Sequence, residues 1–420
     1  MKILLVAFAC HPEWGSESSV GWKMACQLGQ RHQVHVLTHL ENRDGVEKSD
    51  LDPQTRKNLS FSFVGETFRN HPNRWIARLQ SWWEYLRWLR VASREVPPLC
   101  RNHAFDLVHH LTLTTWRIPP IQTPHGMPLI WGPLGGTAGY PWGRIHGFMS
   151  LNSALLESVR NILNSVLPWN PILKKGCRRA AVILGVNEES SRWLKKLAGK
   201  KTTIIQLSAA FFTESQIREF KALSDSRRQK DPLRAFAGGS LIGSKGVGFA
   251  LRALRIAKDQ GVIIPYTIAS HGPEKAFLEK MAKDLGLQDQ VNFHPGYHGP
   301  AYRQALRDHS IYLLPSFREG SAITILEAML SGQVPVVVKA STQGEIVVSS
   351  CGFAAEGKSA EDIVQGLADA LVFLATHPLE KEAMGRSAHE RVASHYHAQR
   401  FLEKLDRAYA TAVGQRSALA

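Results

Sequence analysis

Cysteine, acidic side chains and long apolar runs are all scarce in this 420-residue sequence. The five cysteines are odd in number and form no Cys-x-x-Cys pair, which argues against a disulfide or zinc framework and for reduced thiols in the cytosol. No stretch approaches the roughly 20 apolar residues that a membrane-spanning helix needs. The apolar start is followed by His11-Pro12-Glu13-Trp14 instead of a small-residue cleavage site, so we expect a buried strand there rather than a secretion signal.

The shortage of acids leaves the chain strongly basic. Lys and Arg total 51 against 36 Asp and Glu, and this net charge of +15 indicates an anionic partner: nucleic acid, an acidic membrane surface or a phosphorylated substrate. The excess is uneven, because residues 1–205 hold 26 basic and 14 acidic side chains whereas the remainder holds 25 and 22. No helix-turn-helix, RNP or zinc-finger pattern occurs, so we expect no nucleic-acid partner.

Both halves alternate strand-like and helical patterns, which is typical of doubly wound parallel sheets. In the first half we expect strands at 2–9, 33–38, 59–64, 105–111, 129–132 and 180–186. In the second half we expect strands at 234–237, 263–269, 291–294, 311–315 and 334–338. The sequence therefore predicts an α/β protein whose two Rossmann-like domains face a central cleft.

We place the first domain at 1–205 and the second at 206–385, with C-terminal helices at 386–420 packing back on the first domain. Residues 206–231 are polar and are expected to contain the connection. Ligands of open α/β sheets bind at the carboxyl ends of the strands, so the functional side chains are sought there.

Two carboxylates follow the strand at 311–315. Glu319 lies in the loop, and Glu327 lies about a turn and a half into a helix that begins near Ala322. The N-terminus of that helix suits a phosphate, and the carboxylates suit hydroxyl groups, as in two sugars joined by a diphosphate. The alternative is a helix-capping Glu319 with a solvated Glu327.

Two further loops point the same way. The run 236–246 reads as strand, glycine loop and helix, in which Gly239 and Ser240 allow close backbone approach and Lys245 offers a charge to a phosphate. A plain turn has the same composition. The stretch from Ile268 to Glu274 carries His271, which either lines a ligand site or is an exposed loop histidine.

Together these segments resemble retaining glycosyltransferases of family 4, which have the GT-B fold. The likeness rests on Glu319 and Glu327 with seven residues between them, and on the loops that carry Lys245 and His271. It implies that Glu319 contacts donor-sugar hydroxyls, that Glu327 holds the ribose and that Lys245 neutralises the leaving diphosphate. It further implies that backbone groups near Gly320, Ser321 and Thr324 contact the sugar and the phosphate of the donor.

The sequence departs from the family pattern at two positions in these loops. Ser240 stands where many members of the family have an arginine, so a second cation must come from elsewhere or the site is less positive. His271 replaces a residue that is usually acidic or small and would lie near the nucleotide.

The first half matches the same family. His11-Pro-Glu-Trp-Gly-Ser-Glu17 resembles its N-terminal glycine loop, which places Gly15 and Ser16 against donor phosphate and acceptor. Glu17 either binds an acceptor hydroxyl or simply starts a helix. This segment and Trp131-Gly-Pro-Leu-Gly-Gly136 resemble sequences of a subgroup of the family that is found in exopolysaccharide clusters.

One of two adjacent histidines is expected to touch the donor sugar. His109 and His110 lie at a strand's carboxyl end and point to opposite faces of the sheet, so only one of them can contact the donor sugar. By resemblance we favour His110, which leaves His109 as an acceptor-side candidate.

Residues 74–90 combine aromatic and basic side chains. Trp75, Leu79, Trp82, Leu86 and Leu89 recur at helical spacing with arginines between them. Such a helix suits a membrane interface. A core helix with a solvated basic side would show the same sequence pattern.

The expected activity is retaining transfer of a hexose from a UDP- or GDP-sugar to a lipid-linked or growing glycan, as part of cell-surface or exopolysaccharide synthesis. Lys245, Glu319 and His110 would be catalytic, without a cofactor or a required metal. We expect the enzyme at the inner face of the cytoplasmic membrane, whose anionic lipid would attract the basic first half.

The alternatives are a nucleotide-sugar epimerase and a non-catalytic glycan- or lipid-binding assembly protein of the same shape. A nicotinamide dehydrogenase is disfavoured because no glycine loop reads GxGxxG with an acid about 20 residues on.

Overall fold

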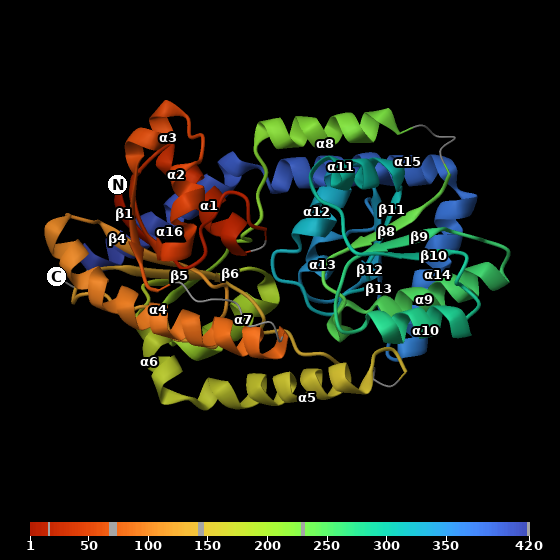
Figure 1. The fold of residues 1–420 in the computed structure, drawn as a ribbon, viewed down its shortest axis with the longest axis horizontal. Coiled ribbons are helices and arrows are strands. Elements are labelled where there is room, and N and C mark those ends of the chain that lie inside the picture. The colour runs from red at the N-terminus through yellow and green to blue at the C-terminus, as the bar shows by residue number, and fades with distance from the viewer. Residues whose placement is uncertain (16, 67–73, 142–146, 228–231, 418–420) are drawn as a thin grey trace. The chain divides into compact units, whose positions relative to one another are not determined.

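The computed structural model describes residues 1–15, 17–66, 74–141, 147–227 and 232–417, with the side chains at 74–79 and 416–417 left aside. The chain forms two compact units. The first comprises residues 1–136, 167–209 and 399–420, and the second comprises 137–166 and 210–398. Each unit contains one parallel sheet (Figure 1).

The first unit is built on a seven-stranded sheet in the order β3-β2-β1-β4-β5-β6-β7. Its strands are β1 Lys2–Ala7, β2 Gln33–His39, β3 Leu59–Val64, β4 Leu107–Thr112, β5 Leu129–Leu134, β6 Val182–Gly185 and β7 Thr203–Gln206. Its helices are α1 Glu17–Gly29, α2 Arg43–Glu47, α3 Pro53–Asn58, α4 Arg74–Asn102, α6 Pro171–Arg179, α7 Glu188–Ala198 and α16 Ala398–Ser417. The central strands are buried along nearly their whole length, which explains their continuous apolar runs.

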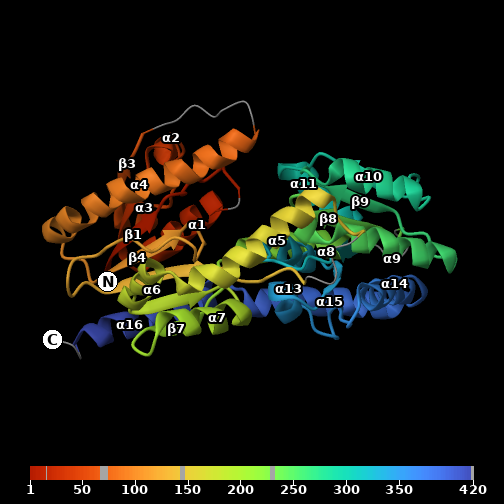
Figure 2. The ribbon, with the colours of Figure 1, turned by 90° about the horizontal axis from the view of Figure 1, so that it is seen from below.

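Helices cover both faces of this first sheet. Leu4 and Val6 of β1 share a core with Tyr85 and Trp88 of α4, and with apolar residues of α6 and α7. On the opposite face, Tyr409 of α16 reaches β4. Helix α16 runs beside α7 and β7 (Figure 2), and it lies within the first unit although it ends the chain.

The second unit is built on a six-stranded sheet in the order β10-β9-β8-β11-β12-β13. Its strands are β8 Ala235–Gly238, β9 Tyr266–Ala269, β10 Val291–His294, β11 Ile311–Leu313, β12 Val334–Val338 and β13 Phe353–Ala355. Its helices are α5 Leu151–Val166, α8 Glu214–Ser226, α9 Val247–Asp259, α10 Lys275–Asp284, α11 Gly299–Asp308, α12 Ile323–Leu330, α13 Ser341–Ile346, α14 Ala360–Thr376 and α15 Pro378–His395. Figure 1 shows α9, α10 and α14 on one side of this sheet and α8, α11 and α15 on the other.

The predicted α/β class and its two parallel sheets are confirmed. The edge strands β7 and β13 were not predicted, and neither was the helix α8, which occupies half of the supposed connection. Helix α8 begins with a capping box in which Thr213 accepts from the Gln216 backbone and Gln216 accepts in return. Ile217 and Phe220 are the buried residues of α8, and the polar residues around them leave too weak an apolar periodicity to predict the helix.

The boundaries of the two units differ from the predicted ones. Residues 137–166 belong to the second unit instead of the first, because polar and aromatic contacts of α5 and the preceding turn tie them there. Phe148, for example, stacks on Phe249 of α9. The predicted C-terminal segment also divides, since α15 stays with the second unit and α16 joins the first. In the described part of the chain, no helix is long and apolar enough to cross a membrane.

Candidate functional site

The candidate site of the second unit lies where its strand order reverses. Strands β8 and β11 are neighbours although far apart in the sequence, and the loops that follow them leave the same carboxyl edge of the sheet. Such a switch point is where open α/β sheets bind ligands. The loops 239–246 and 314–322 both start there and carry most of the predicted donor residues.

A close ion pair joins these two loops. The Nζ of Lys245 donates to Oε1 of Glu319 over 2.6 Å, and the side chains are 17% and 10% exposed. Lys245 ends a short 3-10 turn, Gly243–Lys245, before α9 begins. Opposite charges at this distance and this degree of burial hold each other in place, and they leave little net charge until an anionic ligand competes for the lysine.

Glycine lets the two loops approach. Gly246, the residue before α9, has φ 68°, and a Cβ there would lie 2.1 Å from the carbonyl oxygen of Pro315. Two further hydrogen bonds close the contact, because Phe317 N and Ser316 Oγ both donate to Ser244 O, at 2.9 and 3.3 Å. The backbone therefore fixes where Lys245 meets Glu319.

The start of α13 supports the Glu319 loop from the other side. Ser341 Oγ donates to Glu319 O over 2.8 Å, and Thr342 Oγ1 donates to the carbonyls of Glu319 and Gly320. Ser341 itself has φ 51°, an uncommon value outside glycine. These contacts come from the loop after β12. The position of the Glu319 carboxylate therefore depends on the loops that follow three strands, β8, β11 and β12.

Glu327 lies within α12 and is also held. The hydroxyl of Tyr302, from α11, donates to Glu327 Oε2 over 2.8 Å. Burial and the nearby Glu327 carboxylate raise the pKa of Tyr302 well above its usual range, so this phenol stays a donor. The alternative of a solvated surface carboxylate does not describe Glu327, which is only partly exposed.

The beginning of α12 has no side-chain cap. Ala322 precedes the helix with φ 50°, and as the N-cap residue it offers no side-chain hydrogen bond to the first turn. Thr324, one of the predicted phosphate contacts, shares a 2.9 Å hydrogen bond with the hydroxyl of Tyr312. An uncapped helix start of this kind suits an anionic group. Gly320 and Ser321 lie partly exposed in the loop before it.

The His271 loop lies beside the glycine loop. The backbone N–H of Leu241 donates to His271 O over 2.9 Å, which brings His271 next to Gly239 and Ser240. All three of these predicted residues are exposed. Gly272 makes the approach possible, because a Cβ there would lie 2.2 Å from Leu241 O.

Two buried polar contacts at this edge were not found from the sequence. Arg318, the residue before Glu319, makes a two-pronged bond to Glu157 of α5 with 2.5 and 2.8 Å distances, and also donates to Ser244 Oγ. Glu274, at the end of the His271 loop, accepts from Ser153 Oγ over 2.6 Å. Since Arg318 is committed to Glu157, it does not provide the cation that Ser240 lacks. A buried acid partner so distant in sequence leaves no local signal.

In the first unit, the predicted loop after β1 is described only in part. Gly15 is exposed, and Ser16 lies outside the described residues. Glu17 starts α1, and its Oε1 accepts from the hydroxyl and the backbone N–H of Thr114. Its Oε2 is buried with no hydrogen-bond partner in the described part of the chain. Burial raises the pKa of this carboxyl, although the Thr114 hydrogen bonds act in the opposite direction.

The two adjacent histidines are both fully buried. His109 Nδ1 and Nε2 lie 2.8 Å from Tyr409 Oη and Gly132 O, and Ile121 N donates to His110 Nδ1 over 3.1 Å. Burial lowers the pKa of His109 to about 4 and that of His110 to about 3, so both are neutral at pH 7. His110 was expected at the mouth of the sheet, and the structure instead places it in the core; its donor-sugar contact stays a prediction.

Over its described side chains, the aromatic helix α4 packs one face into the core and leaves the other exposed. Its buried face holds Tyr85 and Trp88, and not the stripe of Trp82 and Leu86 that was read as apolar. Trp83, between the two faces, is 62% exposed. The predicted residues at 74–79 lie outside the described side chains. With aromatics on nearly every side, the sequence alone could not reveal which stripe faces the sheet.

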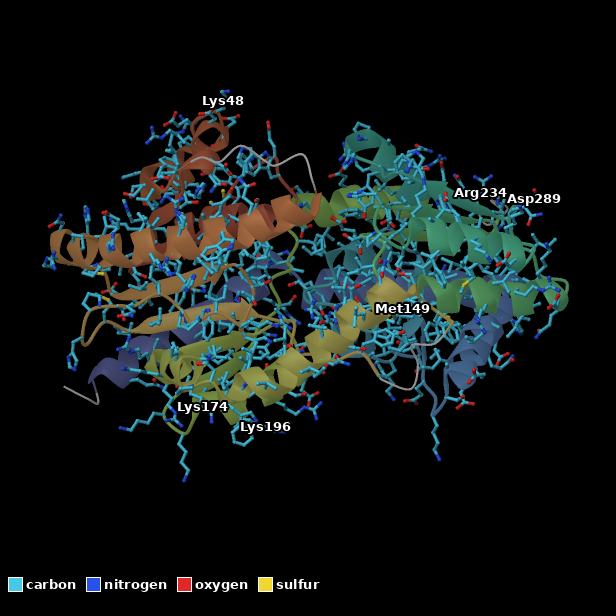
Figure 3. The ribbon with its side chains drawn as sticks, turned by 60° about the horizontal axis from the view of Figure 1, so that its bottom comes forward. Lys48, Met149, Lys174, Lys196, Arg234 and Asp289 are labelled. Carbon is cyan, nitrogen blue, oxygen red and sulfur yellow. The ribbon has the colours of Figure 1, made fainter. Side chains whose placement is uncertain are left out.

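A hollow of about 590 Å³ opens in the first unit beside the loop after β1. The rings of His11 and Trp14 stack at 4.1 Å in its wall, and Lys48, labelled in Figure 3, lies at its edge. Its wall includes Asp50 and Asp52, which form an Asp-x-Asp sequence. The expectation of no metal rested on the absence of any Asp-x-Asp, and that ground is wrong. In the described part of the chain, no group of three or more His, Cys, Asp or Glu side chains is placed to hold a metal ion. Asp52 caps α3 by accepting from Thr55 N over 2.9 Å.

Comparison with known proteins finds similarity within the second unit. Residues 223–373 match the family described as Glycosyl transferases group 1. The amylovoran biosynthesis glycosyltransferase AmsK of Erwinia amylovora is 35% identical over 112 residues, which cover 25% of this chain and 27% of that protein. The putative colanic acid biosynthesis glycosyltransferase WcaL of Escherichia coli is 28% identical over 189 residues, or 43% of this chain and 44% of that one. The chain thus spans less than half the length of these two relatives.

A solved structure extends the likeness to both units. Alr3699/HepE of Anabaena, crystallised with UDP, superposes with a TM-score of 0.60 over 98% of this chain and 100% of that one, at 13% identity. At this identity the likeness shows the fold alone, which is GT-B, with two Rossmann-like parallel-sheet domains.

Proposed function

Since residues 223–373 match the Glycosyl transferases group 1 family, we propose that the protein is a retaining hexosyltransferase that uses a UDP- or GDP-sugar. Its acceptor would be a lipid-linked or growing glycan of a cell-surface polysaccharide. The observation that carries this proposal is the Lys245–Glu319 pair at the switch point of the second sheet. The pairing puts a cation for a diphosphate next to an acceptor for sugar hydroxyls.

In the proposed reaction, the bond between the anomeric carbon and the diphosphate oxygen breaks while the acceptor hydroxyl attacks from the same face. Lys245 and the uncapped start of α12 offset the negative charge that develops on the leaving diphosphate. Glu319, released from Lys245 by the phosphate, accepts hydrogen bonds from sugar hydroxyls. Glu327, held by Tyr302, accepts from the ribose. As the new glycosidic bond forms, the acceptor hydroxyl passes its proton to the departing diphosphate oxygen.

The names of the similar proteins support the substrate class. AmsK is named for amylovoran synthesis and WcaL, putatively, for colanic acid, both of which suggest an exopolysaccharide. The Anabaena protein has also been crystallised with UDP-glucose, which makes that sugar the first donor to test. For the acceptor side, the hollow with Trp14 and its carboxylates offers ring stacking and hydroxyl acceptors to a glycan.

The deciding experiment measures donor use. The purified chain is incubated with radiolabelled UDP- and GDP-hexoses and with lipid extract, and both transfer and donor hydrolysis are followed. We expect Glu319→Gln and Lys245→Ala each to lower kcat by at least about 100-fold, on the scale of one lost transition-state contact. Lys280→Ala breaks a comparable but exposed pair with Asp284 and should have no effect.

Two results would contradict the proposal. The first is no transfer and no hydrolysis with any donor, which would favour a non-catalytic binding protein. The second is full activity in Glu319→Gln and Lys245→Ala, which would move the chemistry elsewhere. An altered hexose formed without any acceptor would instead identify an epimerase. The configuration of the product at the anomeric carbon, read by NMR, tests retention directly.

A further inference from the structure

Helix α5 presents its apolar side to solvent and its polar side to the protein. Four polar residues are buried: Ser153, Glu157, Asn161 and Asn164. The opposite side is formed by large aliphatic residues, and this outer apolar face consists of Leu155, Leu156, Val159, Ile162, Leu163 and Val166. A helix on a soluble core normally has the reverse arrangement.

Hydrogen bonds fix this orientation of α5. Glu157 receives both arms of Arg318, and Asn161 accepts from Tyr140 N over 2.9 Å while donating to Tyr140 O over 2.7 Å. Ser153 donates to Glu274. Turning the aliphatic side inward would leave a buried guanidinium and a buried carboxylate without partners, which costs several kcal/mol. The outward apolar face is therefore built into the unit.

The outer apolar face is widely exposed. Leu155 is 65% exposed, Ile162 55% and Val166 59%, and the spacing of the six residues forms one continuous stripe. Single exposed aliphatic residues are common, but a contiguous stripe on one helix marks a surface that contacts another phase or another molecule. Figure 2 shows α5 as a long helix, and Met149, labelled in Figure 3, lies just before its start.

Charged residues in the sequence of this helix and directly after it are nearly all basic. Between residues 151 and 187 the sequence has a single acid, Glu157, which is buried against Arg318. The residues that follow α5 in the chain, within the first unit, add a 77% exposed Trp169 and four basic side chains at 174, 175, 178 and 179. Lys174 is labelled in Figure 3. Exposed apolar groups can insert into a lipid surface, and basic side chains near them in the sequence are attracted to anionic headgroups.

We propose that the outer apolar face of α5 inserts into the interfacial layer of an anionic lipid bilayer. A second copy of the chain is a poorer occupant. A 16-residue helix is about 24 Å long and about 10 Å wide, so its face offers a few hundred Å² against the roughly 800 Å² per partner of a stable protein interface. A bilayer needs no such complementary partner surface. The inference extends the proposed function, which has a lipid-linked acceptor, but it needs neither donor nor acceptor for its test.

The test uses the full chain and vesicles of phosphatidylcholine with 30% phosphatidylglycerol, followed by flotation. The triple variant Leu155→Gln, Val159→Gln and Ile162→Gln changes only exposed positions, so the fold should survive, as circular dichroism and an unchanged melting temperature would show. We expect its partition coefficient to fall at least about tenfold, because each side chain gives up part of its transfer free energy.

Matched controls separate this face from general hydrophobicity. The double variant Ile263→Gln and Leu379→Gln removes aliphatic residues that are 65% and 66% exposed elsewhere in the same unit, and should bind as the wild type does. Trp83→Gln on α4 should also retain most binding. Wild-type binding should weaken on vesicles of phosphatidylcholine alone and at high salt.

Three results would overturn the proposal: equal flotation of wild type and triple variant, equal binding to neutral vesicles, and a concentration-dependent dimer that only the wild type forms in light scattering. The last would assign the face to a second copy. UDP binding by the triple variant, measured by calorimetry, should equal that of the wild type. Failure of the lipid test with intact UDP binding would therefore leave the proposed function standing.

Discussion

Arg318 and Glu157 are joined by two hydrogen bonds of 2.5 and 2.8 Å, although 161 residues separate them in the sequence, and each side chain is 8% exposed. Because Arg318 immediately precedes Glu319, this buried pair also anchors the loop that carries the proposed donor-binding carboxylate. The same bond fixes the orientation of α5. One interaction thus supports both the candidate site and the outer apolar face.

Breaking this pair from one side should destabilise the second unit strongly. Glu157→Leu leaves a buried guanidinium without its carboxylate, which costs about 3–5 kcal/mol. We expect the melting temperature to fall by about 10 °C in calorimetry. The double variant Glu157→Leu with Arg318→Met removes both charges and should recover much of the loss. If the single and double variants melt alike, the pair is not the source of the stability.

Tyr302→Phe should weaken binding of the nucleotide without unfolding the site. The change removes the donor that holds Glu327 and keeps the ring in the core. If Glu327 contacts the ribose, we expect the Kd for UDP to rise roughly fivefold, equivalent to about 1 kcal/mol. Tyr396→Phe, in the same unit, is the control and should bind UDP as the wild type does. An unchanged Kd in Tyr302→Phe would argue against the ribose role of Glu327.

Acid should destabilise the first unit through its buried histidines. The pKa values of His109 and His110, about 4 and about 3 when folded, lie below their ordinary 6.5. Below pH 6.5 the unfolded chain therefore binds protons that the folded chain does not, and stability present above that pH is lost as the pH falls. At pH 5 the loss is roughly 2 kcal/mol per histidine.

Urea unfolding at pH 7.5 and pH 5.0 measures this effect. The free energy of unfolding of His109→Gln should differ less between the two pH values than that of the wild type, because one titrating group is gone. The glutamine amide can still donate to Gly132 O and accept from Tyr409. A variant with the same pH dependence as the wild type would show that His109 titrates normally in the folded chain.

Transfer should proceed without a divalent metal. In the proposed mechanism Lys245 and the start of α12 take the role of balancing the diphosphate charge. We expect rates in excess EDTA and in millimolar Mg²⁺ to agree within about twofold. Loss of activity in EDTA with recovery on adding Mg²⁺ or Mn²⁺ would contradict this. Asp50→Asn with Asp52→Asn would then show whether the Asp-x-Asp sequence holds the ion.

Much of the fold and of the candidate site could be predicted because the signals are local. Central strands such as Val334–Val338 are buried on both faces and read as unbroken apolar runs. Gly246 marks a tight approach, and Glu319 and Lys245 lie in loops after strands, where ligand-binding residues gather. Edge strands β7 and β13 escaped prediction because three or four residues carry too little pattern.

The periodicity of the sequence could not predict which face of a helix is buried. Helix α4 has aromatic residues on several sides, and only packing against β1 and β4 selected Tyr85 and Trp88 as its buried face. Helix α5 is amphipathic in sequence, and the usual rule would bury its leucines. The distant partners Arg318 and Glu274 reverse that rule by pairing with its polar side.

The sequence by itself determined the α/β class, the alternation of elements, the loops that hold Lys245 and Glu319 and the helix that holds Glu327, because each depends on neighbours within a few residues. Only the tertiary structure decided which of these groups meet. The Lys245–Glu319 bond spans 74 residues, and the polar anchoring of α5 depends on loops more than 100 residues away. Pairing over such separations follows from the order of strands in a sheet, and that order leaves no local trace in the chain.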